Sequence, residues 1–94
     1  MIADGDSEAY ANTYADTYQA QLQAGKSRHW AMAYAYSIAQ GKSEAFATTV
    51  ADAYEPQRQA GKSRHWAMDY AERIAQGQEP EEAERYANNL HPNG

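Results

Sequence analysis

Apolar residues recur along this chain at the spacing of one face of a helix. Residues three and four positions apart lie on the same helical face, so such spacing predicts amphipathic helices. The pattern occurs in five segments, at roughly 7–24, 27–40, 43–60, 63–76 and 79–90. In the first segment the stripe consists of Tyr10, Ala11, Tyr14, Ala15, Tyr18 and Leu22. We therefore expect an all-α fold of five short antiparallel helices.

The segments between the predicted helices share a Gly-Lys-Ser sequence, at 25–27, 41–43 and 61–63, and Gly77 and Pro80 mark the fourth boundary. A glycine just past a helix end adopts the left-handed conformation at low cost, and a serine two residues later can cap the next helix. A phosphate-binding loop would need a further glycine five residues earlier, where Ala20, Tyr36 and Pro56 stand, and a preceding strand. The sequence therefore predicts tight turns at these positions.

The chain contains a long internal repetition. Residues 7–41 align without a gap with residues 43–77 at a displacement of 36 residues, and QAGKSRHWAM occurs at both 23–32 and 59–68. This predicts one domain over 1–94, with a first repeat at 7–42, a second at 43–78 and a partial capping repeat at 79–94. Whether the two and a half helical hairpins form a small α-solenoid or a closed bundle is left open by the sequence.

Pro56 conflicts with the helical pattern around it. It lies inside the third predicted helix, where proline removes a backbone hydrogen bond and clashes with the preceding turn. The sequence therefore predicts a kink or an early helix end between Asp52 and Pro56.

Two helices in each repeat and a period in the mid-thirties make the chain resemble the tetratricopeptide class of α-solenoid repeats over nearly its whole length. The likeness lies in the period and the helix pairing. It does not extend to the family's residue pattern, because the position four residues after Trp30 is Tyr34, where that family has a glycine. The resemblance implies recognition of peptides or proteins on a concave surface.

Composition limits the core and the classes of function. Only seven residues are Leu, Ile, Val or Phe, so Ala, Tyr, Trp and Met must supply most of the buried surface. The chain has no cysteine, which excludes disulfides and thiolate chemistry, and its net charge of −5 disfavours nucleic-acid binding. No signal peptide or membrane-spanning segment is recognisable, so a soluble, cytoplasmic protein is the default expectation. We expect no catalytic site, no metal site and no cofactor.

The aromatic residues suggest a binding surface. Eleven of them exceed what so small a domain can bury, and exposed apolar patches usually mean association. The sequence therefore predicts a non-catalytic module that binds a protein partner or a second copy of itself. The candidate interface residues are Tyr14, Tyr18, Trp30, Tyr36 and Trp66. Tyr36 is preferred, because its equivalent in the second copy is Glu72.

A basic edge provides an alternative site for an anion or small ligand. Two adjacent helix N-termini would bring together two sets of basic residues, and helix starts with Lys and Arg attract anions. These residues are Lys26, Arg28, His29, Lys62, Arg64 and His65. Two further alternatives stay open, a small acidic inhibitor and a designed or consensus repeat without a native function. The repeated Arg-His-Trp is explained equally by a function or by a recent duplication.

Overall fold

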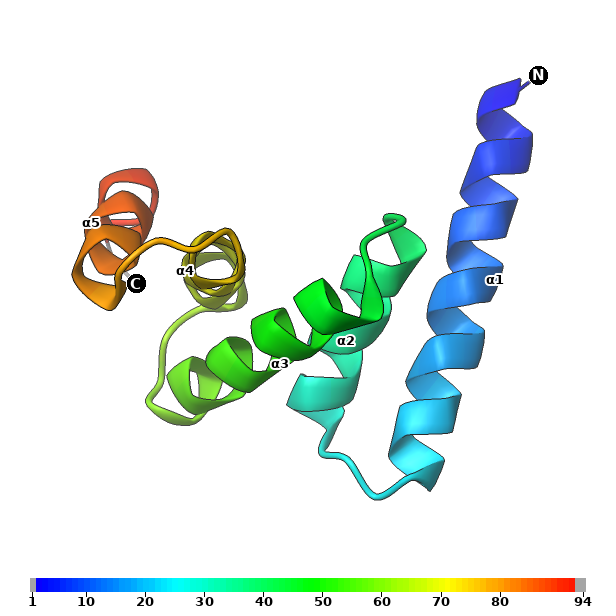
Figure 1. Ribbon diagram of the computed structural model, residues 1–94. Coiled ribbons are helices and arrows are strands. Elements are labelled where there is room, and N and C mark those ends of the chain that lie inside the picture. Colours follow the sequence, from blue (N-terminus) through cyan, green and yellow to red (C-terminus); the bar gives the residue numbers. More distant parts are fainter. Residues whose placement is uncertain (1, 93–94) are drawn as a thin grey trace.

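The computed structural model describes the backbone of residues 2–92 and the side chains of residues 8–92. Within that range the chain forms five α-helices and no strand, which confirms the all-α prediction (Figure 1). The helices are α1 (Ile2–Gln23), α2 (Arg28–Ala39), α3 (Glu44–Gln59), α4 (Arg64–Ala75) and α5 (Pro80–Leu90). The predicted bounds are close to these, except that α1 begins at Ile2 rather than near residue 7. None of these helices is both long enough and apolar enough to cross a membrane.

The turns have the predicted chemistry. The glycine after each of the first four helices has a positive φ of 90–101°, a conformation that other residues adopt only with strain. Ser27, Ser43 and Ser63 each accept a hydrogen bond from the backbone N–H three residues later, at 3.1–3.2 Å. In the fourth turn Glu79 and Glu82 form a capping box, and Pro80 is the first helical residue.

The helices are stacked in sequence order. All extensive contacts join helices that follow one another in the chain, and α3 lies between α2 and α4. Figure 1 shows α1 at one end of the molecule and α5 at the other. As a result α3 packs on two sides, whereas α1 and α5 each have only one packed side.

The core is centred on α3 and is built from alanines facing aromatic rings. Its main cluster joins three helices through Trp30, Ala33, Val50, Ala51, Tyr54, Ala67 and Ala71. A second cluster joins α4 to α5 through Trp66, Tyr70, Ala83 and Ala87. The alanines let the helix backbones approach closely, and the large rings fill the space beside them. A chain with very few Leu, Ile, Val and Phe residues obtains its packed interior in this way.

Of the two alternatives predicted for the third helix, a kink or an early end, the early end is wrong, and the kink stays a prediction. Helix α3 continues through Pro56 to Gln59. Pro56 cannot donate a backbone hydrogen bond, but the turn after it closes normally, because the Ala60 N–H donates to the Pro56 carbonyl at 2.9 Å. Val50 and Tyr54, in the turns before the proline, are completely buried. Packing of α3 between two helices therefore outweighs the local cost of the proline.

Glu72 on α4 gives a testable pH dependence. Burial raises the pKa of the Glu72 carboxyl, Asp69 raises it further, and Lys42 and Arg73 act in the opposite direction. A carboxyl whose folded-state pKa is raised binds its proton more tightly in the folded state. Its ionisation therefore costs stability as the pH rises from the ordinary value of 4.5 through the raised pKa. We expect Glu72→Gln to raise the melting temperature at pH 7 by a few degrees.

Thermal unfolding followed by circular dichroism at pH 7 and pH 4 checks this expectation. The gain should shrink at the lower pH, where the carboxyl is largely protonated in both states. Glu84→Gln, at an exposed position of α5, serves as the control and should change the melting temperature little. A variant less stable than the parent at pH 7, or equally stabilised at both pH values, would contradict the assignment.

Candidate binding surface

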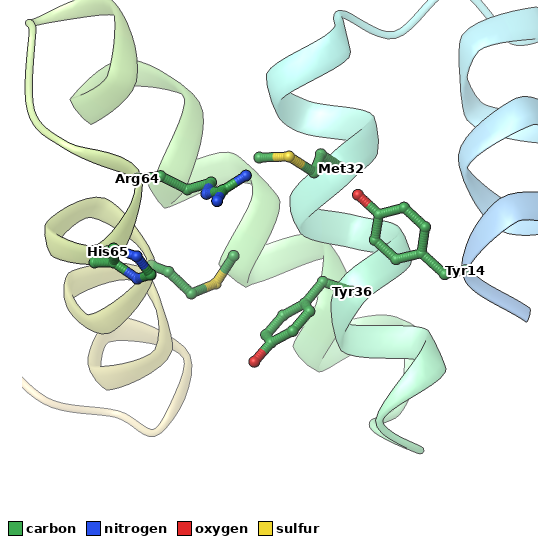
Figure 2. A pocket seen from close by; sticks show the side chains of 6 residues that line it. Tyr14, Met32, Tyr36, Arg64 and His65 are labelled. Carbon is green, nitrogen blue, oxygen red and sulfur yellow. The ribbon is translucent and has the colours of Figure 1, made fainter. Parts of the chain in front are cut away.

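Three helices surround a hollow with a volume of about 270 Å³. Figure 2 shows Tyr14 reaching it from α1, Met32 and Tyr36 from α2, and Arg64 and His65 from α4. Met68 of α4 completes the lining. This set, which we call the central hollow, combines two thioethers, two phenol rings and two basic side chains.

Local helix geometry explains why these residues meet. Met32 and Tyr36 are four residues apart and therefore lie on one face of α2. Their neighbours Ala31, Ala33 and Ala35 are completely buried. Arg64 and His65 are the first two residues of α4, directly after the Ser63 cap. The turn between α3 and α4 thus delivers two basic groups to the rim of a mostly apolar hollow.

The charge of Arg64 has no ionic partner in the described part of the chain. The one ion pair recorded among residues 8–92 joins His91 Nε2 to Asp69 Oδ2 at 2.5 Å. In Figure 2 the Arg64 side chain extends from α4 towards Met32, across the hollow. Arg64 is an exposed residue, and its guanidinium group carries several N–H donors suited to a carboxylate.

Tyr14 adds a hydrogen-bond donor to the hollow. Burial raises the pKa of its hydroxyl, Tyr18 raises it further, and Arg64 acts in the opposite direction. With the pKa above the ordinary value of 10.0, the hydroxyl keeps its proton at neutral pH. The hollow can therefore accept an apolar group on its walls and a carboxylate at its rim.

The structure separates the predicted interface residues into two groups. Tyr14 and Tyr36 line the central hollow, and Tyr18 stacks on Tyr14 with 6.1 Å between ring centroids. Trp30 and Trp66 belong to the core instead, where they are only 8% and 2% exposed. Their ring faces are covered by neighbouring side chains, so they offer little surface to a partner.

The predicted basic edge is divided as well. The Lys26 and Lys62 ammonium groups lie over the Trp30 and Trp66 rings, 4.5 and 4.7 Å from the ring centroids. Such cation–π contacts stabilise the fold and occupy both lysines within the chain.

The remaining four basic residues have different surroundings. Arg28 is exposed, and the His29 ring meets Tyr54 edge to face at 6.4 Å. Arg64 and His65 line the central hollow, and the His65 ring also stacks on His91 at 6.0 Å. A joint anion site of all six basic residues stays a prediction. Arg64 and His65 share the central hollow with Tyr14 and Tyr36, two of the predicted interface residues.

The repeated tryptophan has a structural role in both copies. Trp30 Nε1 donates to Asp52 Oδ1 at 2.8 Å, and Trp66 Nε1 donates to Asn88 Oδ1 at 2.9 Å. In each case the acceptor lies 22 residues further along the chain. The two tryptophans therefore attach α2 to α3 and α4 to α5.

Sequence reasoning missed Met32 and Met68 as lining residues. A signal was present, because Met32 precedes Tyr36 by one helical turn, and the two methionines occupy equivalent positions of the two copies. What the sequence could not show is that Tyr14 of another helix completes the same hollow.

Among residues 8–92 no three His, Asp or Glu side chains lie close enough together to hold a metal ion. Neither a protein-family model, nor a curated protein, nor a solved structure matches this chain significantly.

Proposed function

We propose that this chain is a non-catalytic, helical-repeat module that binds a protein partner in its central hollow. The hollow takes an apolar side chain of the partner, and Arg64 binds a carboxylate next to that side chain. One observation carries the proposal: a guanidinium group without an ionic partner in the described residues stands at the rim of a hollow walled by Met32, Met68 and Tyr36.

The lining chemistry supports protein recognition. Tyr, Met and Arg are enriched in protein interfaces relative to the rest of protein surfaces. Methionine is flexible and polarisable, so Met32 and Met68 can adjust to an aliphatic or an aromatic side chain. The volume of about 270 Å³ is just below the range of about 300–1,000 Å³ typical of small-molecule sites. It suits a single anchoring side chain of a larger partner better than a whole drug-sized ligand.

The mixed lining also favours a carboxylate over a free inorganic anion. An inorganic anion could pair with Arg64 and His65 but would leave the apolar walls of the hollow unused. A segment with Leu or Phe beside Glu or Asp would use both the walls and the guanidinium group. The proposal therefore commits to an acidic and apolar segment of a partner protein.

A peptide titration tests the proposal. The probe is a capped peptide Gly-Leu-Glu-Phe-Glu-Leu-Gly, added to protein labelled with ¹³C in the methionine methyl groups. We expect saturable shifts of the Met32 and Met68 methyl resonances. Arg64→Ala should weaken binding by about tenfold or more, because hydrogen bonds to charged groups contribute about 1.5–3 kcal/mol.

The chain offers a matched control for this variant. Arg28 is the equivalent of Arg64 in the first copy and does not line the hollow, so Arg28→Ala should leave the affinity unchanged. The same peptide with glutamine in place of both glutamates should bind as weakly as Arg64→Ala binds the original. Equal effects of the two arginine variants, equal binding of both peptides, or no saturable shift would each overturn the proposal. If the methyl shifts grew with protein concentration in the absence of peptide, the partner would be a second copy of this chain and not a foreign protein.

A further inference from the structure

One helix-to-helix interface occurs twice in this molecule. In the first case α2 packs on α3, with Trp30 bonded to Asp52 beside the buried Ala51. In the second case α4 packs on α5, with Trp66 bonded to Asn88 beside the buried Ala87. Each tryptophan also stacks on the tyrosine one turn later, at 5.1 and 5.3 Å between ring centroids, and lies under a lysine. The two interfaces thus share the same tryptophan, tyrosine, lysine and alanine contacts, and they differ in the acceptor, Asp52 in one and Asn88 in the other.

The acceptor half of this interface has a common pattern, two alanines four residues apart followed by Asp or Asn. It is formed by Ala47, Ala51 and Asp52 on α3, and by Ala83, Ala87 and Asn88 on α5. All four alanines are completely buried. The short side chains leave room for an indole ring, and the carboxylate or amide oxygen fixes its N–H.

The same pattern of two alanines followed by Asp or Asn occurs a third time, on α1, where neither of the tryptophan-bearing helices packs on it. Ala11, Ala15 and Asp16 stand 36 residues before Ala47, Ala51 and Asp52, and all three are exposed. Helix α2 packs elsewhere on α1, where the partly buried residues are Tyr14, Thr17, Tyr18, Gln21 and Leu22. Because α1 stands at the end of the stack, none of the other four helices packs extensively on its alanine face (Figure 1).

We infer that this face of α1, made of Ala11, Ala15 and Asp16, is a docking site for a helix of the α2 and α4 type other than α2 and α4 themselves. The occupant begins with a serine cap followed by Arg-His-Trp-Ala-Met, and its indole N–H donates to Asp16. Both helices of this type within the chain are already engaged, since Trp30 and Trp66 have Asp52 and Asn88 as acceptors. The inference concerns a different surface from the central hollow and does not depend on the proposed function.

The chemistry of the occupant follows from the two occupied interfaces. A helix without a tryptophan at its third position would leave the Asp16 carboxylate without its donor and the alanine face without a ring. An aliphatic helix can bury apolar area on Ala11 and Ala15, but it has no group for Asp16. The face therefore selects for tryptophan in the same register as Trp30 and Trp66.

The first test adds a capped peptide of residues 59–78, which spans α4, to the full chain labelled with ¹⁵N. We expect saturable amide shifts confined to the α1 segment 8–19. Replacing the tryptophan of the peptide by alanine should weaken binding by about tenfold or more, as for a central aromatic anchor. In the full chain, Ala15→Leu and Asp16→Leu should weaken binding similarly, whereas Asp16→Asn should preserve it, because asparagine serves as the acceptor on α5.

A second measurement tests the docking site even if the isolated peptide does not fold into a helix. A copy of residues 43–78 is placed directly ahead of residue 7, in the register that joins the first repeat to the second. The added α4-type helix should raise the urea midpoint of unfolding above that of the original chain, and Ala15→Leu should remove the gain. An unchanged midpoint in the extended chain would overturn the inference. So would peptide binding that is independent of the tryptophan or insensitive to Ala15→Leu.

Discussion

Trp66→Ala is expected to lower the free energy of unfolding by about 3–5 kcal/mol, the usual cost of removing a large buried aromatic ring. Trp66 is 2% exposed and packs with Ala83 and Ala87 in the cluster that joins α4 to α5. The substitution also removes the hydrogen bond to Asn88 and the ring under Lys62. Since α4 is the only helix with which α5 has extensive contacts, we expect α5 to detach from α4 before the rest of the domain unfolds.

Urea unfolding followed by far-UV circular dichroism measures this loss. Leu90→Ala is the control, because Leu90 lies on the same terminal helix but is 52% exposed. Its effect should stay within about 0.5 kcal/mol, as for surface substitutions in general. A loss below about 1 kcal/mol for Trp66→Ala would contradict a central role of this ring, since large buried aromatic residues cost several times more.

Ala51→Leu is the second large effect, with an expected loss of about 1–3 kcal/mol from overpacking. Ala51 is completely buried in the cluster shared by α2, α3 and α4. Its equivalent in the first copy is Ala15, which is exposed on α1. Ala15→Leu should therefore change stability by no more than about 0.5 kcal/mol. The same substitution at equivalent positions of the repeat is thus expected to be clearly destabilising in α3 and nearly neutral in α1.

The pair is measured by the same unfolding experiment at one protein concentration. Both variants gain the same side chain within closely related helical sequences, so differences in helix propensity largely cancel. If Ala15→Leu proved as damaging as Ala51→Leu, the alanine face of α1 would have to be buried in solution. That result would remove the basis for a free docking site at Ala11, Ala15 and Asp16.

Much of the fold was predictable because its signals are local. The left-handed glycines, the serine caps and Pro80 act within one turn of the chain, and they mark the helix ends without reference to tertiary contacts. The apolar stripes likewise depend only on helical periodicity. For these reasons the number and the order of the five helices, and their approximate bounds apart from the start of α1, follow from the sequence alone.

The candidate site was predictable only in part. Tyr14, Tyr36, Arg64 and His65 were all recognised as binding candidates, but as members of two separate surfaces. Met32 and Met68 carry no charge or motif. Their equivalent positions in the two copies, and the position of Met32 one turn before Tyr36, do not by themselves assign them to a site. The hollow exists because α1, α2 and α4 converge, and such convergence depends on packing between distant segments.

The sequence by itself determined the positions of the four turns between the helices and which positions repeat. Only the tertiary structure decided which copies are buried: it placed Ala51 inside and Ala15 outside, and it placed Trp30 and Trp66 in the core. It also carried α3 through Pro56, because burial on two sides outweighs one missing backbone bond. The physical reason is that caps and turns act within a few residues, whereas burial depends on which helix lies on each face.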